Sequence, residues 1–198
     1  FKKIATISET TNVLLAFLNK FNDYYPNLCA KSSDIQLTKE IITLVDAVAD
    51  KYGEIKDNAS PRLLEIRREM NLVRGKVNQS FASALTQYNS LGYLDDIKES
   101  FVQNRRVLAV LAMYRRKVKG SILGSSKTGS IAYIEPENTL KYSRELSNLE
   151  YEEKEEITKI LKQLSNAIRP FLPLLIQYQD FLSDIDVIAS KAKYANRI

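Results

Sequence analysis

Hydrophobic residues recur every three or four positions over most of the chain, and this spacing predicts a mainly helical protein. The apolar positions between Ile4 and Asn19 predict a first helix, and the Tyr24–Asn27 run predicts the turn that ends it. A second helix is predicted over roughly Gln36–Tyr52, with Gly53 placed to end it. We expect residues 1–56 to form the first part of a packed helical base.

The strongest helix signal follows Ser60 and Pro61, a capping residue and a proline at the favoured first helical position. The next apolar residues are spaced three and four apart, as in a heptad seam: Leu63, Ile66, Met70, Val73 and Val77. Polar and charged residues fill the opposite face. This long helix, assigned to residues 57–100, therefore needs one partner helix rather than a surrounding core.

A second long stripe follows Glu135 and Pro136, within residues 136–171. Its positions are Leu146, Leu149, Glu153, Ile157, Ile160, Leu164, Ile168 and Phe171. Two long helices separated by a short insert run antiparallel if they pair, which predicts a two-helix lever. Two separate amphipathic helices lying on the first two helices are the alternative.

The insert between the long helices, residues 101–135, changes character. Its short apolar runs are bounded by glycine, serine and threonine, which predicts a few antiparallel strands. The run Val107–Met113 alone also fits a buried helix. Residues 172–198 are predicted to be helical again and to complete the base, with Pro170 and Pro173 at the junction. The predicted fold is mainly α: a helical base, a long antiparallel two-helix lever and a small β-rich tip.

Charge distinguishes the insert from the rest of the chain. The net charge is only +5, but residues 101–134 contain seven basic residues and no aspartate or glutamate. A polyanionic partner explains this depletion, and a solvated loop that happens to be basic is the alternative. Arginine forks onto phosphate oxygens, lysine supplies a compact charge, and tyrosine stacks or donates a hydrogen bond. The predicted nucleic-acid-binding residues are Arg105, Arg106, Tyr114, Arg115, Arg116, Lys117, Lys119 and Lys127.

Such groups hold a phosphate backbone without reading bases, so no sequence specificity is predicted. The same contacts serve DNA and ribosomal RNA, and both remain candidate partners.

Catalytic chemistry has no positive support in the sequence. The absence of histidine removes the commonest general base and the usual zinc ligand. The run Gly120–Gly129 resembles a phosphate-binding loop but has serine where the second glycine belongs and lysine one place late. The glutamates between Glu152 and Glu156 are interpreted as a solvated helix face. We therefore predict no catalytic, cofactor-binding or metal-binding residues.

The chain has the features of an excised fragment, because it begins at Phe1 without a methionine and shows no secretory signal. No apolar run reaches the roughly 20 residues that cross a bilayer. A single cysteine, Cys29, cannot form an internal disulfide and is interpreted as a small buried hydrophobe. These features favour a reducing, cytoplasmic location without membrane contact.

Three separated patches resemble the MutS family, in its second bacterial branch, which carries a C-terminal Smr nuclease domain. Asp57–Met70 resembles the start of that family's lever helix, and Asp186–Ala192 its return into the core. The family's clamp is matched at Arg106-Val-Leu-Ala-Val, Arg115, Gly120, Ser126, Gly129, Ile134-Glu135-Pro136 and Leu146. The chain departs at Asn104-Arg105, where the family has asparagine-glycine, and at Leu123-Gly124, where it has histidine-aspartate.

This resemblance implies the core, lever and clamp of a homodimeric ATPase that binds branched or mismatched DNA and suppresses recombination. Some members act on collided ribosomes. The ATPase domain, with its ATP and Mg, and the nuclease domain would lie outside this chain. The resemblance covers residues from about 55 onward, and residues 1–54 match only as a helical region. A coiled-coil module for protein interaction or dimerisation is the alternative function.

Overall fold

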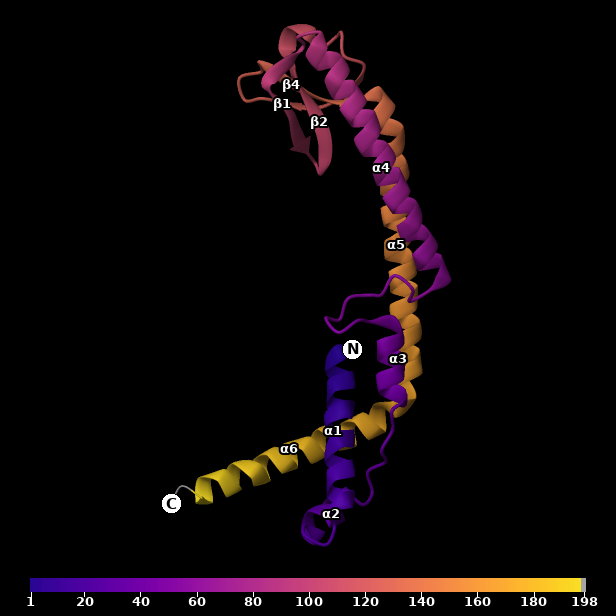
Figure 1. Cartoon of the computed structure of the whole chain (residues 1–198), viewed down its shortest axis with the longest axis vertical. Coiled ribbons are helices and arrows are strands. Elements are labelled where there is room, and N and C mark those ends of the chain that lie inside the picture. The colour runs from indigo at the N-terminus through magenta and orange to yellow at the C-terminus, as the bar shows by residue number, and fades with distance from the viewer. Residues whose placement is uncertain (197–198) are drawn as a thin grey trace. The chain divides into compact units, whose positions relative to one another are not determined.

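The computed structural model describes residues 1–196 and divides them into two compact units. The helical unit comprises Phe1–Pro61 and the chain from Ile157 onward, and the sheet unit comprises Arg62–Glu156. Helices dominate both, and the four strands form one small sheet (Figure 1). The predicted fold class, mainly α with a small β part, is confirmed. Within residues 1–196, no helix has the length and apolarity to cross a bilayer.

The helical unit contains α1 (Lys2–Lys20), α2 (Pro26–Ser32), α3 (Glu40–Val48), the end of α5 (Glu137–Ile168), the 3-10 turn Arg169–Phe171 and α6 (Leu172–Ala195). The turn predicted at Tyr24–Asn27 was wrong in part, because Pro26 takes the first position of α2, where a proline is favoured. The helix predicted over Gln36–Tyr52 is shorter. Tyr178 is fully buried and its hydroxyl donates to the Gln36 carbonyl at 2.6 Å, which holds that segment outside α3.

Two apolar clusters hold the helical unit together. Val45 of α3 and Ala49, which directly follows α3, pack with Leu164 and Ile168 of α5. The second cluster joins α1 to α6 through Leu15, Leu18 and Phe181. Cys29, interpreted above as a small buried hydrophobe, packs beside this cluster but is only half-buried, and its thiol donates to the Leu18 carbonyl at 3.2 Å.

The sheet unit is built on α4 (Pro61–Ser90) and the first part of α5, which lie side by side and run antiparallel (Figure 1). Their seam contains the predicted residues Ile66, Met70, Val73 and Leu149, all buried. Two ion pairs border it: Arg67 with Glu153 at 2.7 Å and Arg62 with Glu152 at 2.5 Å. These two glutamates, interpreted above as part of a solvated face, thus bind α4.

The predicted lever boundaries differ from the structure at both ends. The outgoing helix, assigned to residues 57–100, ends at Ser90, and the stripe of the returning helix is divided between the two units. Only its first part faces α4, because Leu164 and Ile168 pack on α1 and α3. A heptad-like stripe shows that a helix has a partner but does not identify that partner.

The sheet contains β1 (Leu94–Val102), β2 (Arg105–Leu111), β3 (Gly120–Ser125) and β4 (Ile131–Pro136) in the antiparallel order β1-β2-β4-β3. It begins before residue 101, the predicted boundary. The missed strand, β1, is an edge strand whose first six residues read Leu-Asp-Asp-Ile-Lys-Glu, too polar to produce a strand signal. The Val107–Met113 run is a strand to Leu111 followed by the 3-10 turn Ala112–Tyr114, which excludes a buried helix.

One face of the sheet packs on the C-terminal half of α4. Phe81, Ala84 and Tyr88 of α4 meet apolar residues of the strands, and the whole cluster is buried. The strand side consists of Leu108, Val110, Ala132 and Ile134, with Val118 from the β2–β3 connection. This cluster fixes the sheet, and with it the connection, on α4.

Gly120 is required by close strand packing. A Cβ atom at this position would lie 2.1 Å from the carbonyl oxygen of Glu135 and 2.9 Å from a methyl carbon of Ile134. The first glycine of the Gly120–Gly129 run therefore permits the pairing of β3 with β4, and Gly120–Ser125 is strand rather than a loop that opens a helix.

We expect Gly120→Ala to lower the free energy of unfolding of the sheet unit by about 1–3 kcal/mol or more, because backbone atoms must move. Gly75→Ala is the matched control. No atom lies within 4 Å of the position that a Cβ atom at Gly75 would take on α4. Alanine at this position should therefore raise the free energy of unfolding by roughly 0.5–1 kcal/mol. Urea denaturation monitored by circular dichroism measures both, and equal effects of the two substitutions would contradict the packing argument.

Candidate nucleic-acid interface

The predicted basic cluster lies mainly in the β2–β3 connection, residues 112–119. The connection begins with the 3-10 turn Ala112–Tyr114, and the amide of Lys117 donates to the Tyr114 carbonyl at 2.8 Å. Val118 is 5% exposed and inserts into the cluster between the sheet and α4. The amide of Lys119 donates to the Tyr88 hydroxyl at 3.3 Å. A compact turn and one buried side chain therefore direct the neighbouring basic residues outward.

A ladder of three tyrosines supports this connection. The rings of Tyr93 and Tyr114 stack with centroids 4.6 Å apart, and Tyr88 lies next to Tyr93 at 6.4 Å. The Lys117 amino nitrogen lies 5.7 Å and 5.6 Å from the ring centroids of Tyr93 and Tyr114, within cation–π range. Tyr114, predicted to contact nucleic acid, is half-buried and orders the connection through this stack.

Four basic side chains of the connection are exposed: Arg115, Arg116, Lys117 and Lys119. Lys127 is exposed as well, on the turn between β3 and β4. Among residues 1–196, none of these five forms an ion pair with a carboxylate. Their charge is thus open to solvent and available to an anion.

The sheet topology sets where these charges lie. The amide of Ala112 donates to the Ser130 carbonyl at 2.9 Å, which brings the start of the connection next to the turn that bears Lys127. Lys119 precedes Gly120, which pairs with Pro136 at the opposite end of β4. The basic residues are therefore distributed along the length of the sheet.

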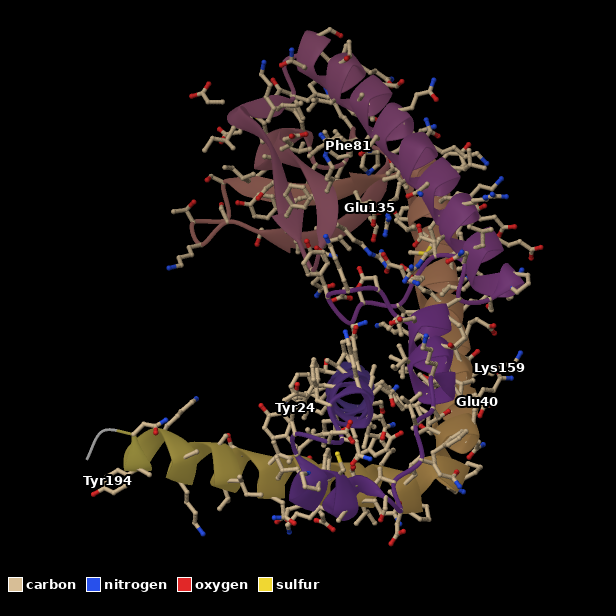
Figure 2. The ribbon with its side chains drawn as sticks, turned by 60° about the horizontal axis from the view of Figure 1, so that its bottom comes forward. Tyr24, Glu40, Phe81, Glu135, Lys159 and Tyr194 are labelled. Atoms are coloured by element: carbon tan, nitrogen blue, oxygen red, sulfur yellow. The ribbon has the colours of Figure 1, made fainter. Side chains whose placement is uncertain are left out.

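Arg105 and Arg106 have a different environment from the other predicted residues. Arg105 forms a 3.1 Å ion pair with Glu135, which is 1% exposed and is labelled in Figure 2. Arg106 pairs with Glu99 at 2.7 Å and lies 4.4 Å from the ring centroid of Phe81. Both guanidinium groups are therefore already neutralised inside the sheet unit. Their partners lie just outside the acid-free window 101–134, which is why the sequence did not reveal the pairing.

Of the two departures from the family pattern, Arg105, where the family has glycine, is the first residue of β2 and pairs with Val102. The β1–β2 turn is formed by Gln103 and Asn104, with φ of 49° and 63°. Glycine accepts such positive φ at no cost and asparagine tolerates it, whereas glutamine is disfavoured there. Leu123-Gly124 lies where the β3 register shifts between Ile122 and Gly124.

No protein-family model matches the chain. Bacterial proteins named endonuclease MutS2 are similar to it over most of its length. The one from Geobacillus sp. is 26% identical over 98% of this chain and 25% of its own length. Those from Lachnoclostridium phytofermentans and Carboxydothermus hydrogenoformans are each 34% identical, over 70% and 72% of this chain and 18% of their own length.

These similarities support a MutS2-like family. The chain spans about a quarter or less of the MutS2 relatives that it matches.

Arg105→Ala should lower the free energy of unfolding by roughly 1–3 kcal/mol, because buried Glu135 would lose its partner. Arg116→Ala, at an exposed position without an ion pair among residues 1–196, should change it by less than about 0.5 kcal/mol. Chemical denaturation of both variants checks this division into structural and available arginines. Equal stability of the two variants would show that the Arg105–Glu135 pair has no structural role.

Proposed function

We propose that the chain is the non-catalytic core, lever and clamp region of a MutS2-like DNA-binding ATPase. The helical unit is its core, α4 with the first part of α5 is its lever, and the four-stranded sheet with its connections is its clamp. Similarity to MutS2 endonucleases over most of the chain supports the family assignment.

The exposed basic residues carry the assignment of function to the clamp. Arg115, Arg116, Lys117, Lys119 and Lys127 have no acidic partner among residues 1–196, whereas Arg105 and Arg106 are both paired. Unpaired positive charges repel one another and lower the stability of the folded state. Here a buried valine and the tyrosine ladder nevertheless hold such charges close together, which favours a bound anion as their function. Phosphate contacts of this kind position a nucleic acid without reading its sequence.

The proposal assigns the catalytic activities to other regions of the intact protein. The ATPase and nuclease activities, with their ATP and Mg, belong to regions outside this chain, and so does the contact that makes a homodimer. ATP binding there would move the lever and thereby open or close the clamp. Branched or mismatched DNA is the proposed ligand, and ribosomal RNA offers the clamp the same phosphate chemistry.

The coiled-coil interaction module is not favoured by a specific observation. That function needs an apolar seam open to a partner. Val73, at the centre of the seam, is 3% exposed and packs with Leu149 of the same chain.

Duplex and branched DNA binding measured against salt tests the clamp assignment. Arg115→Glu combined with Arg116→Glu should weaken binding at least tenfold. It should also lower the slope of log K against log salt by about 1.8, at roughly 0.9 for each lost phosphate contact. Lys3→Glu combined with Arg68→Glu changes the net charge equally at two exposed positions outside the sheet and should have little effect. Wild-type affinity in the Arg115/Arg116 variant would contradict the proposal.

A further inference from the structure

Two hollows of the sheet unit adjoin each other. The first, of about 540 Å³, lies between α4 and α5 and is lined by Lys76, Gln79, Lys141 and Tyr142, among others. The second, of about 400 Å³, lies beside the tyrosine ladder and is lined by Gln87, Tyr88, Tyr93, Lys117 and Lys119, among others. Glu137 and Asn138 line both hollows. The two hollows therefore lie next to each other along the helix pair, and together they are here named the α4–α5 groove.

Helical spacing places one polar row of α4 along the groove. Lys76, Ser80, Ser83 and Gln87 are three or four residues apart and all line it. At 1.5 Å per residue, the distance from Lys76 to Gln87 is about 17 Å along the helix axis. The hydroxyl of Ser80 contacts that of buried Thr139 on α5 at 3.2 Å, so the two walls are fixed to each other. The groove thus extends for about three turns of α4 and lies between two helices that contact each other.

The charge of the groove is positive and uncompensated. Its lysines are Lys76, Lys117, Lys119 and Lys141, against the single carboxylate of Glu137. None of the four forms an ion pair within the part of the chain that the structure describes. A third hollow of the sheet unit, lined by Arg74, Arg105 and Arg106, is different, because two of its arginines are paired and Glu150 also lines it.

Each half of the groove combines a lysine with a tyrosine. The Lys76 amino nitrogen lies 5.9 Å from the ring centroid of Tyr142, and that of Lys117 lies 5.7 Å from the ring centroid of Tyr93. Gln79, Gln87 and Asn138 add amide donors and acceptors. Aromatic surface next to cations along a positively charged groove is the arrangement that holds single-stranded nucleic acid, whose bases are free to stack. A duplex turns its bases inward and offers such a groove only phosphates.

We propose that the α4–α5 groove binds an unpaired nucleic-acid strand, with lysines contacting phosphates and with Tyr142 and the amide side chains contacting bases. The inference rests on the proposed clamp function and refines its ligand to a duplex that continues into a single strand. It also adds Lys76, Lys141 and Tyr142, which lie on the two long helices outside the basic segment 101–134. Lys117 and Lys119 serve both the groove and the duplex-binding surface.

Fluorescence anisotropy with a labelled oligothymidylate tests the groove. Lys76→Glu combined with Lys141→Glu should weaken binding at least tenfold and lower the logarithmic salt slope by about 1.4, at roughly 0.7 for each contact on a single strand. Both positions are exposed, so the fold should persist, which circular dichroism checks. The Lys3→Glu and Arg68→Glu pair is again the matched control. An oligouridylate arm shows whether DNA or RNA is the preferred strand.

The outcomes separate the two proposals. Weaker oligothymidylate binding in the Lys76/Lys141 variant, with duplex binding unchanged, supports the groove. Wild-type affinity of that variant for both oligonucleotides overturns the groove, even where the Arg115/Arg116 variant loses duplex binding and the clamp assignment stands. If the Arg115/Arg116 variant keeps its duplex affinity while the Lys76/Lys141 variant loses the single strand, the groove still binds a strand, but the clamp surface, and with it the forked ligand, is wrong.

Discussion

The packing of the sheet on α4 is the constraint on which the candidate interface depends. A small open sheet has little stability of its own and needs a partner for one face. Phe81 and Ile134 are fully buried at this contact, and burial of each such side chain contributes about 1.5–3 kcal/mol. Val118 belongs to the same cluster. The contact that stabilises the sheet therefore also positions the basic residues on either side of Val118.

Two groups of basic residues in the sheet unit have different physical environments. Arg62, Arg67, Arg105 and Arg106 pair with carboxylates and join helix to helix or strand to strand. Those of the β2–β3 connection and of the α4–α5 groove have no such partner among residues 1–196. Concentrated positive charge costs stability through mutual repulsion, and a polyphosphate partner relieves that cost. The contrast between paired and unpaired basic residues within the sheet unit supports a binding role for the unpaired residues more strongly than the net charge of the chain does.

The sequence predicted the features that depend on local pattern. The Ser60-Pro61 start of α4 and the buried positions of its seam follow from capping preference and heptad spacing. Features that depend on tertiary pairing were missed. Strand β1 is a polar edge, and the assignment of Leu164 to the helical unit depends on which helix meets α5.

The candidate site was predictable in part, for the same reason. The connection 112–119 was identified because its charges are consecutive in the sequence. The pairing of Arg106 with Glu99 was not, because it crosses from β2 to β1. The groove residues Lys76 and Lys141 are far apart in sequence and become neighbours of one hollow only when α4 and α5 pair. The pairing of strands and helices thus removed Arg106 from the predicted nucleic-acid contacts and added Lys76 and Lys141 to the candidate binding residues.

Hydrogen exchange of the chain with and without a forked DNA, read by mass spectrometry, tests whether the sheet unit holds nucleic acid through its basic connection. Slower exchange is expected in the β2–β3 connection, residues 112–119, and in the β3–β4 turn near Lys127, with residues 1–56 unchanged. Slower exchange confined to residues 1–56, or no change anywhere at saturating DNA, would show that this surface does not bind the DNA.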